Sequence, residues 1–104
     1  MMTAWSRASC EANRISMHYI RTGGSDNPPL ILLHGLTANG ACWMPVAHAL
    51  AGEYDVIMPD ARGHGKSSAP NEGYQYEDHA NDVESLIAAL ELTLPTVIGH
   101  SMGT

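Results

Sequence analysis

The sequence predicts an α/β protein whose sheet is mostly parallel and is flanked by helices. Short apolar segments alternate with segments whose apolar residues recur at helical spacing, and this alternation is typical of βαβ units. One apolar segment is a continuous run, as expected of a strand that is buried on both faces of a parallel sheet. The 104 residues, 44% of them apolar, fit one small domain with one core.

The first three expected strands precede the first helix. Residues 5–10 are expected to form a short strand and residues 11–13 a turn. Residues 15–21 place their odd-numbered apolar side chains on one face, which predicts a half-buried strand. A loop over 22–29, rich in Gly and Pro, leads to the apolar run 30–33, which fits a strand buried on both faces.

A helix over 43–51 and a strand over 55–58 are expected next. Pro45 suits the first turn of the helix, and Gly52 suits its C-terminal stop. Four residues at helical spacing form the expected apolar stripe of this helix: Trp43, Val46, Ala47 and Leu50.

The last part of the chain predicts a long loop over 60–73, a helix over 76–92 and a short strand over 96–98. The helix carries the clearest apolar stripe in the sequence: Ala80, Val83, Leu86, Ile87 and Leu90. The acidic residues of this region are expected to form a solvated face: Glu72, Glu77, Asp78, Asp82, Glu84 and Glu91.

Composition excludes several classes of function. The net charge of −6 argues against nucleic acid as a partner. Cys10 and Cys42 form no CxxC pattern, so neither a disulfide framework nor a zinc site is expected, and free thiols indicate a reducing compartment. Residues 1–14 hold no long apolar run, so we expect neither a secretory signal nor a membrane span, and place the protein in the cytoplasm.

The segment Gly99-His-Ser-Met-Gly103 follows an apolar strand and carries the pattern Gly-x-Ser-x-Gly. A strand-to-helix turn of this kind strains the backbone at Ser101 and lifts its hydroxyl clear of the sheet. Glycines two residues on either side leave room for the close packing. The sequence therefore predicts Ser101 as a nucleophile, with the backbone N–H of Met102 facing a developing oxyanion. Gly99, His100 and Gly103 are expected to support this turn.

His34 and Gly35 follow the buried run 30–33 and open a loop. Gly35 permits a sharp bend, so that the N–H of Leu36 is expected to face the space above the sheet as a second oxyanion donor. His34 is expected to hold this loop rather than to carry a proton.

Residues 59–68, PDARGHGKSS, invite two other interpretations that fail on single residues. A phosphate-binding P-loop ending at Gly65-Lys66-Ser67 needs a glycine where Asp60 stands. A dinucleotide fingerprint starting at Gly63 needs a glycine where Ser68 stands. The remaining interpretation is structural, with Asp60 and Arg62 holding the loop through charge-assisted hydrogen bonds.

These motifs, HG, D-x-R-G-H-G-x-S and G-H-S-M-G in this order, resemble the α/β-hydrolase superfamily over residues 12–104. The branch it looks most like contains small esterases, lactonases, haloperoxidase-like proteins and hydrolases of amide or C–C bonds. The resemblance implies a mostly parallel sheet of eight strands, of which this chain holds the first five, the second antiparallel to its neighbours. It also implies a small-molecule substrate, no cofactor and no metal.

The family's triad runs Ser, then Asp or Glu, then His along the chain. Nothing follows Thr104, so residues 1–104 are expected to be an incomplete domain that lacks the acid and the histidine. Because loss of the histidine costs ~10⁶ in kcat, we expect the chain alone to be inactive, and no other histidine to replace the missing one. The alternative is a non-catalytic remnant, or a segment that associates with another chain. The strand over 96–98 is expected to be an exposed, aggregation-prone edge.

Overall fold

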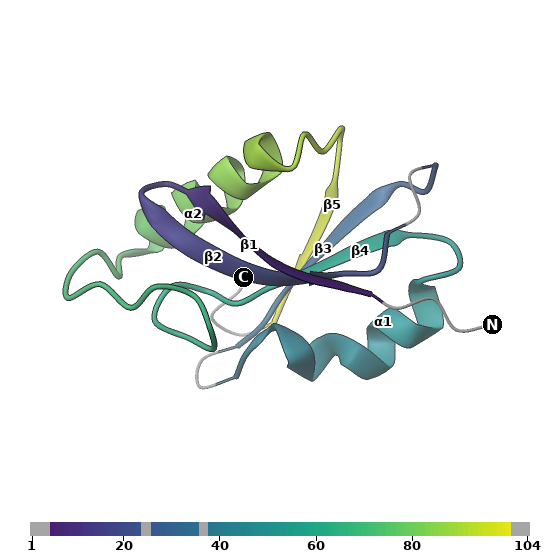
Figure 1. Ribbon diagram of the computed structural model, residues 1–104, viewed down its shortest axis with the longest axis horizontal. Coiled ribbons are helices and arrows are strands. Elements are labelled where there is room, and N and C mark those ends of the chain that lie inside the picture. Colours follow the sequence, from purple (N-terminus) through teal and green to yellow (C-terminus); the bar gives the residue numbers. More distant parts are fainter. Residues whose placement is uncertain (1–4, 24–25, 36–37, 101–104) are drawn as a thin grey trace.

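The computed structural model of the protein describes residues 5–23, 26–35 and 38–100. A single mixed sheet runs through the described chain, with α1 and α2 on opposite faces (Figure 1). The elements in chain order are β1 (Ser6–Ala12), β2 (Ile15–Arg21), β3 (Pro29–Leu33), the 3₁₀ helix η1 (Gly40–Trp43), α1 (Met44–Leu50), β4 (Asp55–Pro59), α2 (Tyr76–Ala89) and β5 (Thr96–Gly99). Neither described α-helix has the length and apolar character needed to cross a membrane.

The strand order is β1-β2-β4-β3-β5. β3 runs parallel to both β4 and β5, whereas β2 is antiparallel to β1 and to β4. Five strands, a mostly parallel core and an antiparallel second strand therefore confirm the predicted arrangement. Each parallel pair is joined by a segment that contains a helix, as parallel pairing requires.

Alternate residues of the central strands enter two separate apolar layers. Ile31 and Ile57 pack with Leu86 of α2 on one face of the sheet. Leu30, Leu32 and their neighbours on β4 pack with Ala47 of α1 on the other face. Because side chains alternate along a strand, a continuous apolar run supplies both layers at once. The sheet is thus the middle layer of an α/β/α arrangement.

Two details of the first strands differ from expectation. The turn lies at Asn13 and Arg14, both with positive φ (53° and 67°), and Ala12 already pairs with Ile15. Two successive positive-φ residues are the backbone of a tight hairpin turn, which matches the twist of its strands. β2 is buried on both faces rather than one, because Ile20 packs in the α1 layer while Ile15 packs in the α2 layer.

The helices match their predicted positions with local exceptions. Pro45 lies in the first turn of α1, as predicted, but a 3₁₀ turn precedes the helix and Val46 is exposed. In α2 the predicted stripe is centred on Leu86, which is fully buried, while Ala80 is exposed. The prediction of a solvated acidic face is wrong for Asp82, which is 2% exposed.

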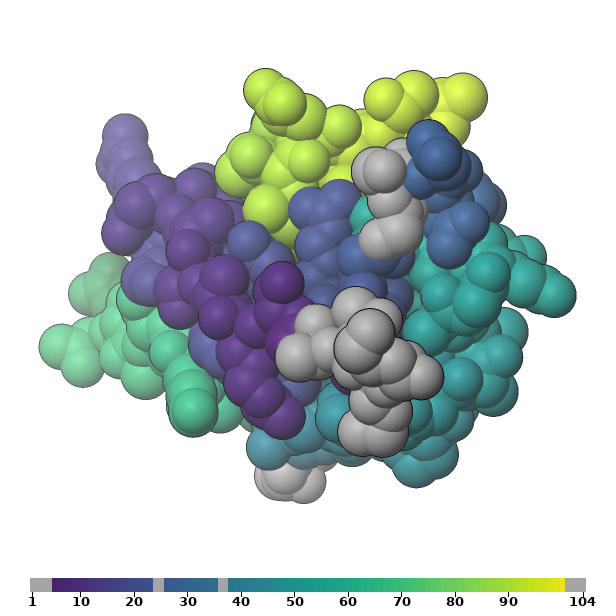
Figure 2. All heavy atoms as spheres, turned by 45° about the vertical axis from the view of Figure 1, so that its right-hand side comes forward, coloured from purple at the N-terminus to yellow at the C-terminus, as the bar shows by residue number. Residues whose placement is uncertain are grey.

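β5 lies at one edge of the described sheet, next to β3. Its residues Val97 and Ile98 are 43% and 44% exposed, although both are apolar. The yellow atoms of this region lie at the periphery of the space-filling view (Figure 2). The expected exposed edge is therefore present in the described part of the chain.

Candidate active site

The two motifs that were predicted to form the site meet at one end of the parallel strands. In the β3–β5 register Leu33 lies opposite Gly99, and the N–H of His100 donates to the carbonyl oxygen of Leu33 at 3.1 Å. His34 and Gly35 therefore begin their loop beside the residues that precede position 101. Ser101, Leu36, Met102 and Gly103 lie outside the described residues, so their predicted roles stay predictions.

His34 is held by both of its ring nitrogens. Nδ1 lies 2.7 Å from the carbonyl oxygen of Gly35, and Nε2 accepts a hydrogen bond from the N–H of Ala61 at 2.9 Å. A carbonyl accepts and an amide N–H donates, so this pair of partners selects the neutral ring with its hydrogen on Nδ1. Burial lowers the pKa of His34 below its ordinary value of 6.5, in agreement with that geometry. The two hydrogen bonds join the ring to backbone atoms of Gly35 and Ala61, and its supporting role at a catalytic site stays a prediction.

Asp60 is the centre of a buried hydrogen-bond network at the end of β4. Its Oδ1 accepts from the N–H of Gly40 at 2.7 Å, and its Oδ2 accepts from the N–H of Lys66 at 3.0 Å. Nδ1 of His18 lies 3.1 Å from the same Oδ2 and donates to it, because a carboxylate only accepts. The predicted role of Asp60 in fixing the loop is thereby confirmed.

The serines of the 60–73 loop attach it to β2. The hydroxyl of Ser68 accepts from the N–H of Ser16 at 2.9 Å. The hydroxyl of Ser67 accepts from the N–H of His18 at 2.9 Å and donates to the carbonyl oxygen of Asp60 at 2.6 Å. The loop thus continues the pairing that β4 makes with β2, which keeps Asp60 in place.

Arg62 binds the same loop to α2 through Asp82. Its Nε and Nη2 donate to the two carboxylate oxygens of Asp82 at 2.6 and 2.7 Å, and Nη1 donates to the carbonyl oxygen of Gly73 at 2.5 Å. Asn13 adds a further hydrogen bond to Asp82 at 3.0 Å. The hydrogen bonds to the carboxylate of Asp82 raise the pKa of Arg62 above its ordinary value. The buried pair of Arg62 and Asp82 therefore connects the turn between β1 and β2, the 60–73 loop and α2.

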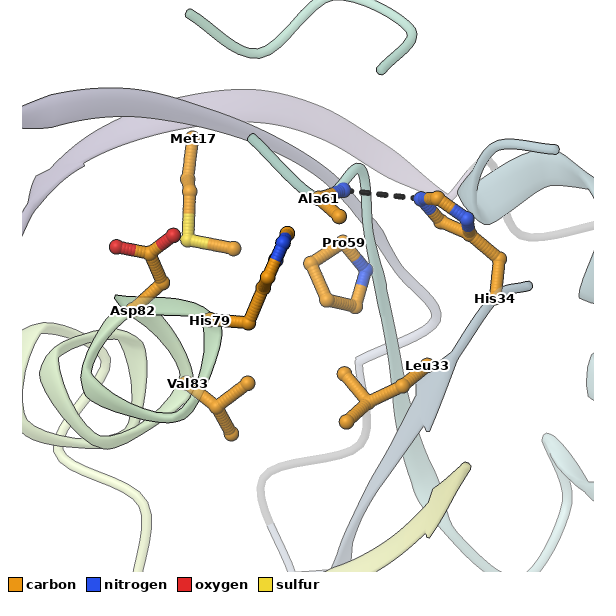
Figure 3. Close-up of a pocket in the computed structure, with 8 residues that line it drawn as sticks. All are labelled: Met17, Leu33, His34, Pro59, Ala61, His79, Asp82 and Val83. Atoms are coloured by element: carbon orange, nitrogen blue, oxygen red, sulfur yellow. Dashed lines mark hydrogen bonds between the residues drawn. The ribbon is translucent and has the colours of Figure 1, made fainter. Parts of the chain in front are cut away.

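A cavity of about 40 Å³ lies between α2 and the ends of the central strands (Figure 3). Its volume suits one or a few water molecules and is too small for an organic substrate. His79 points into the space between Asp82 and Pro59, and burial lowers its pKa below the ordinary value. The lining residues are Met17, Leu33, His34, Pro59, Ala61, His79, Asp82 and Val83. No cluster in the described ranges has the acidic, His or Cys side chains in a metal-binding arrangement.

Sequence reasoning missed the structural roles of His18, Gly40 and Asp82. A weak signal existed for two of them. His18 is a polar residue between Met17 and Tyr19 in the middle of its strand, and Asp82 precedes Leu86 by one helical turn, on the buried row of α2. The sequence around Gly40 gave no signal of its role. A glycine is needed there because a Cβ atom would meet the carbonyl oxygens of Met58 and Pro59, which are distant in the chain.

Comparison with known proteins agrees with this geometry. A soluble epoxide hydrolase of Corynebacterium sp. is 37% identical over 103 residues, which are 99% of this chain and 35% of that protein. An N-formylmaleamate deformylase of Pseudomonas putida is 38% identical over 104 residues, 99% of this chain and 38% of that protein. The crystal structure of epoxide hydrolase A from Mycobacterium thermoresistibile superposes with a TM-score of 0.90 at 29% identity, over 96% of this chain and 32% of that one.

The chain thus spans about a third of the length of these relatives, whose names state different activities. The family model for the alpha/beta hydrolase fold matches residues 28–104, from the start of β3 through the segment that contains position 101. Together with the strand order and the junction of β3 and β5, this match identifies the chain as a member of the α/β-hydrolase family.

Proposed function

We propose that this chain supplies the nucleophile and the oxyanion hole of a serine hydrolase that acts on a small carbonyl substrate. The observation that carries the proposal is the junction of β3 and β5, where His100 binds Leu33. That junction brings His34 and Gly35 next to Gly99 and His100, where the Gly-x-Ser-x-Gly motif begins. A nucleophile and two backbone donors from these two segments would then surround one carbonyl group.

In the proposed reaction the hydroxyl oxygen of Ser101 forms a bond to the substrate's carbonyl carbon. The carbonyl electron pair moves to oxygen, where the N–H groups of Leu36 and Met102 stabilise the negative charge. The leaving group departs when the carbonyl re-forms, and water then hydrolyses the acyl-serine. In the family order the base and its acid follow the serine, so we propose that residues outside 1–104 supply them and that the chain alone is inactive.

The hydroxyl at position 101 favours acyl transfer over the epoxide chemistry that the names of some relatives state. Attack of a serine oxygen on an epoxide carbon would leave an ether, which water does not readily cleave. Attack on a carbonyl leaves an ester, which water hydrolyses. We therefore propose an ester, lactone, amide or ketone-adjacent C–C bond as the substrate, a choice closer to the named deformylase than to the epoxide hydrolases.

We propose a cytoplasmic location as well. Both Cys10 and Cys42 are free thiols, and a reducing compartment preserves them in that state. Burial and, as the smaller cause, the negative charge of Glu11 raise the pKa of Cys10. A smaller fraction of this thiol is therefore present as the reactive thiolate.

The test begins with the DNA beyond codon 104 and continues with the polypeptide of the whole reading frame. We expect hydrolysis of p-nitrophenyl esters of short acids, and a loss of ~10⁴-fold or more in kcat on Ser101→Ala. Ser6→Ala, an exposed serine on β1, is the matched control and should leave the rate unchanged. Hydrolysis that survives Ser101→Ala, or none in the wild-type protein, would contradict the proposal and favour a non-catalytic chain.

A further inference from the structure

Two adjacent residues, Asp60 and Ala61, hold the two ends of the segment 34–40. At its start, the ring of His34 accepts a hydrogen bond from the N–H of Ala61 at 2.9 Å. At its end, the N–H of Gly40 donates to Oδ1 of Asp60 at 2.7 Å. Between these points the N–H of Ala38 donates to the carbonyl oxygen of Gly35 at 3.2 Å, as in a tight turn. The segment is therefore fixed at both described ends from one place, the C-terminal end of β4.

Asp60 is itself held too tightly to move independently of the sheet. It is 5% exposed, and His18 and the N–H of Lys66 bind its second carboxylate oxygen. His18 belongs to β2, the strand next to β4, so the support comes from the interior of the sheet. At the other end of the contact, a Cβ atom on Gly40 would meet the carbonyl oxygen of Met58, so Gly40 lies directly against β4.

From this geometry we propose that Asp60 is a positioning residue for the oxyanion donor, with His18 as its support. The inference rests on the proposed function, which places that donor on the segment between His34 and Gly40. Asp60 touches no reacting atom in this scheme. It sets where the segment lies relative to β5, whose end leads into the nucleophile motif.

The effect on the reaction follows from how oxyanion stabilisation depends on distance. A donor acts only when it lies at hydrogen-bond distance from the oxygen that becomes negative in the transition state. A displacement of about 1 Å, even one caused by a distant change, costs about 10²-fold in rate. Release of Gly40 should therefore lower kcat and leave KM nearly unchanged, because the ground-state substrate depends less on that donor.

Asp60→Asn is the main variant, because it alters hydrogen bonding with little change in volume. The two carboxylate oxygens each accept from a backbone N–H, one from Gly40 and one from Lys66. A backbone N–H cannot become an acceptor, so the amide group of asparagine must face a donor in either orientation. Asp82→Asn is the matched control, since it disturbs a buried carboxylate whose hydrogen bonds, among the described residues, go to Arg62 and Asn13 and not to segment 34–40.

The first readout compares an oxygen ester with the matching thionoester in the whole protein. Sulfur accepts hydrogen bonds weakly, so the thionoester gains little from oxyanion donors. For Asp60→Asn we expect kcat on the ester to fall about 10- to 100-fold and the ester-to-thionoester ratio to fall about 10-fold. Asp82→Asn should change both substrates by the same factor. Equal losses on both substrates for Asp60→Asn, or no loss, would overturn the inference.

The second readout is amide hydrogen exchange, which needs no activity. Asp60→Asn should speed exchange in a peptide spanning residues 34–40 by about 10-fold relative to Asp82→Asn. If Asp60→Asn does not fold, His18→Ala should show the same change, and His18→Asn, which keeps a donor near the position of Nδ1, should restore it. If the wild type lacks Ser101-dependent hydrolysis, the proposed function fails, and exchange alone decides whether Asp60 holds the segment. Unchanged exchange in that peptide would refute the inference.

Discussion

Arg62→Met should be among the most destabilising single substitutions in this chain. The methionine keeps much of the side chain's apolar length but removes the guanidinium that binds Asp82 and Gly73. Of the three hydrogen bonds that Asp82 accepts from other side chains, the one from Asn13 at 3.0 Å remains. The variant therefore measures the free-energy cost of leaving the buried carboxylate of Asp82 without its cationic partner.

The magnitude follows from the burial of both partners. The side chains of Arg62 and Asp82 are 7% and 2% exposed, so water cannot easily replace the lost donors. Removal of one partner of a buried ion pair typically costs about 3–5 kcal/mol. Because the whole stability of a typical protein is about 5–15 kcal/mol, this single change takes a large share of it.

Urea unfolding of the whole protein, followed by circular dichroism, measures the loss. Arg7→Met is the matched control: Arg7 is exposed on β1, so the same substitution there should change stability by less than about 0.5 kcal/mol. Replacing both partners, Arg62→Met with Asp82→Leu, should recover part of the stability, because no buried charge is then left unpaired. A loss below about 1 kcal/mol for Arg62→Met, or no recovery in the double variant, would refute the reasoning.

The remaining predictions concern pH and one glycine. The pKa values of His34 and His79 are lowered in the folded protein, so the unfolded chain binds more protons in acid. Stability should therefore fall as the pH drops below the unfolded value of about 6.5, and urea midpoints between pH 7.5 and 5 should fall less steeply when both histidines are replaced by glutamine. An identical slope in that double variant would contradict this. Gly40→Ala should cost about 1–3 kcal/mol, because its Cβ meets the carbonyl oxygen of Met58. Gly52→Ala, where nothing lies within 4 Å, should be nearly neutral in the same unfolding assay.

The strands were predictable because the residues of each central strand form a short apolar segment that is visible without knowledge of its neighbours. The run 30–33 supplies both apolar layers, and local hydrophobicity is enough to reveal that. The antiparallel direction of the second strand came instead from the resemblance to a known family, since no local pattern specifies how a strand runs relative to its neighbours. The position of the hairpin turn was predicted wrongly because the positive φ angles of Asn13 and Arg14 match the twist of the two paired strands. The local sequence does not show that pairing.

The hydrogen-bond networks were harder to predict, because their partners are distant in the chain. Asp82 resembles its acidic neighbours on α2 until Arg62, twenty residues earlier, is brought against it. Likewise His18 meets Asp60 across 42 positions. Asp60 was identified as a structural residue from its motif, but its contact with Gly40 depends on how η1 approaches the end of β4. Such contacts follow from the fold and leave little trace in composition or periodicity.

The strand order also sets a schedule for synthesis. β2 pairs with β4, not with β3, so the edge of β2 that faces away from β1 stays unpaired until β4 has been made. In that pairing Arg21 lies opposite Ile57. At the usual 5–20 residues per second, the 36 intervening peptide bonds take roughly 2–7 s to make. During that time β1 and β2 exist as a lone hairpin, which is marginally stable in water. β3 and α1 are therefore synthesised before the hairpin meets the strand that is its permanent neighbour.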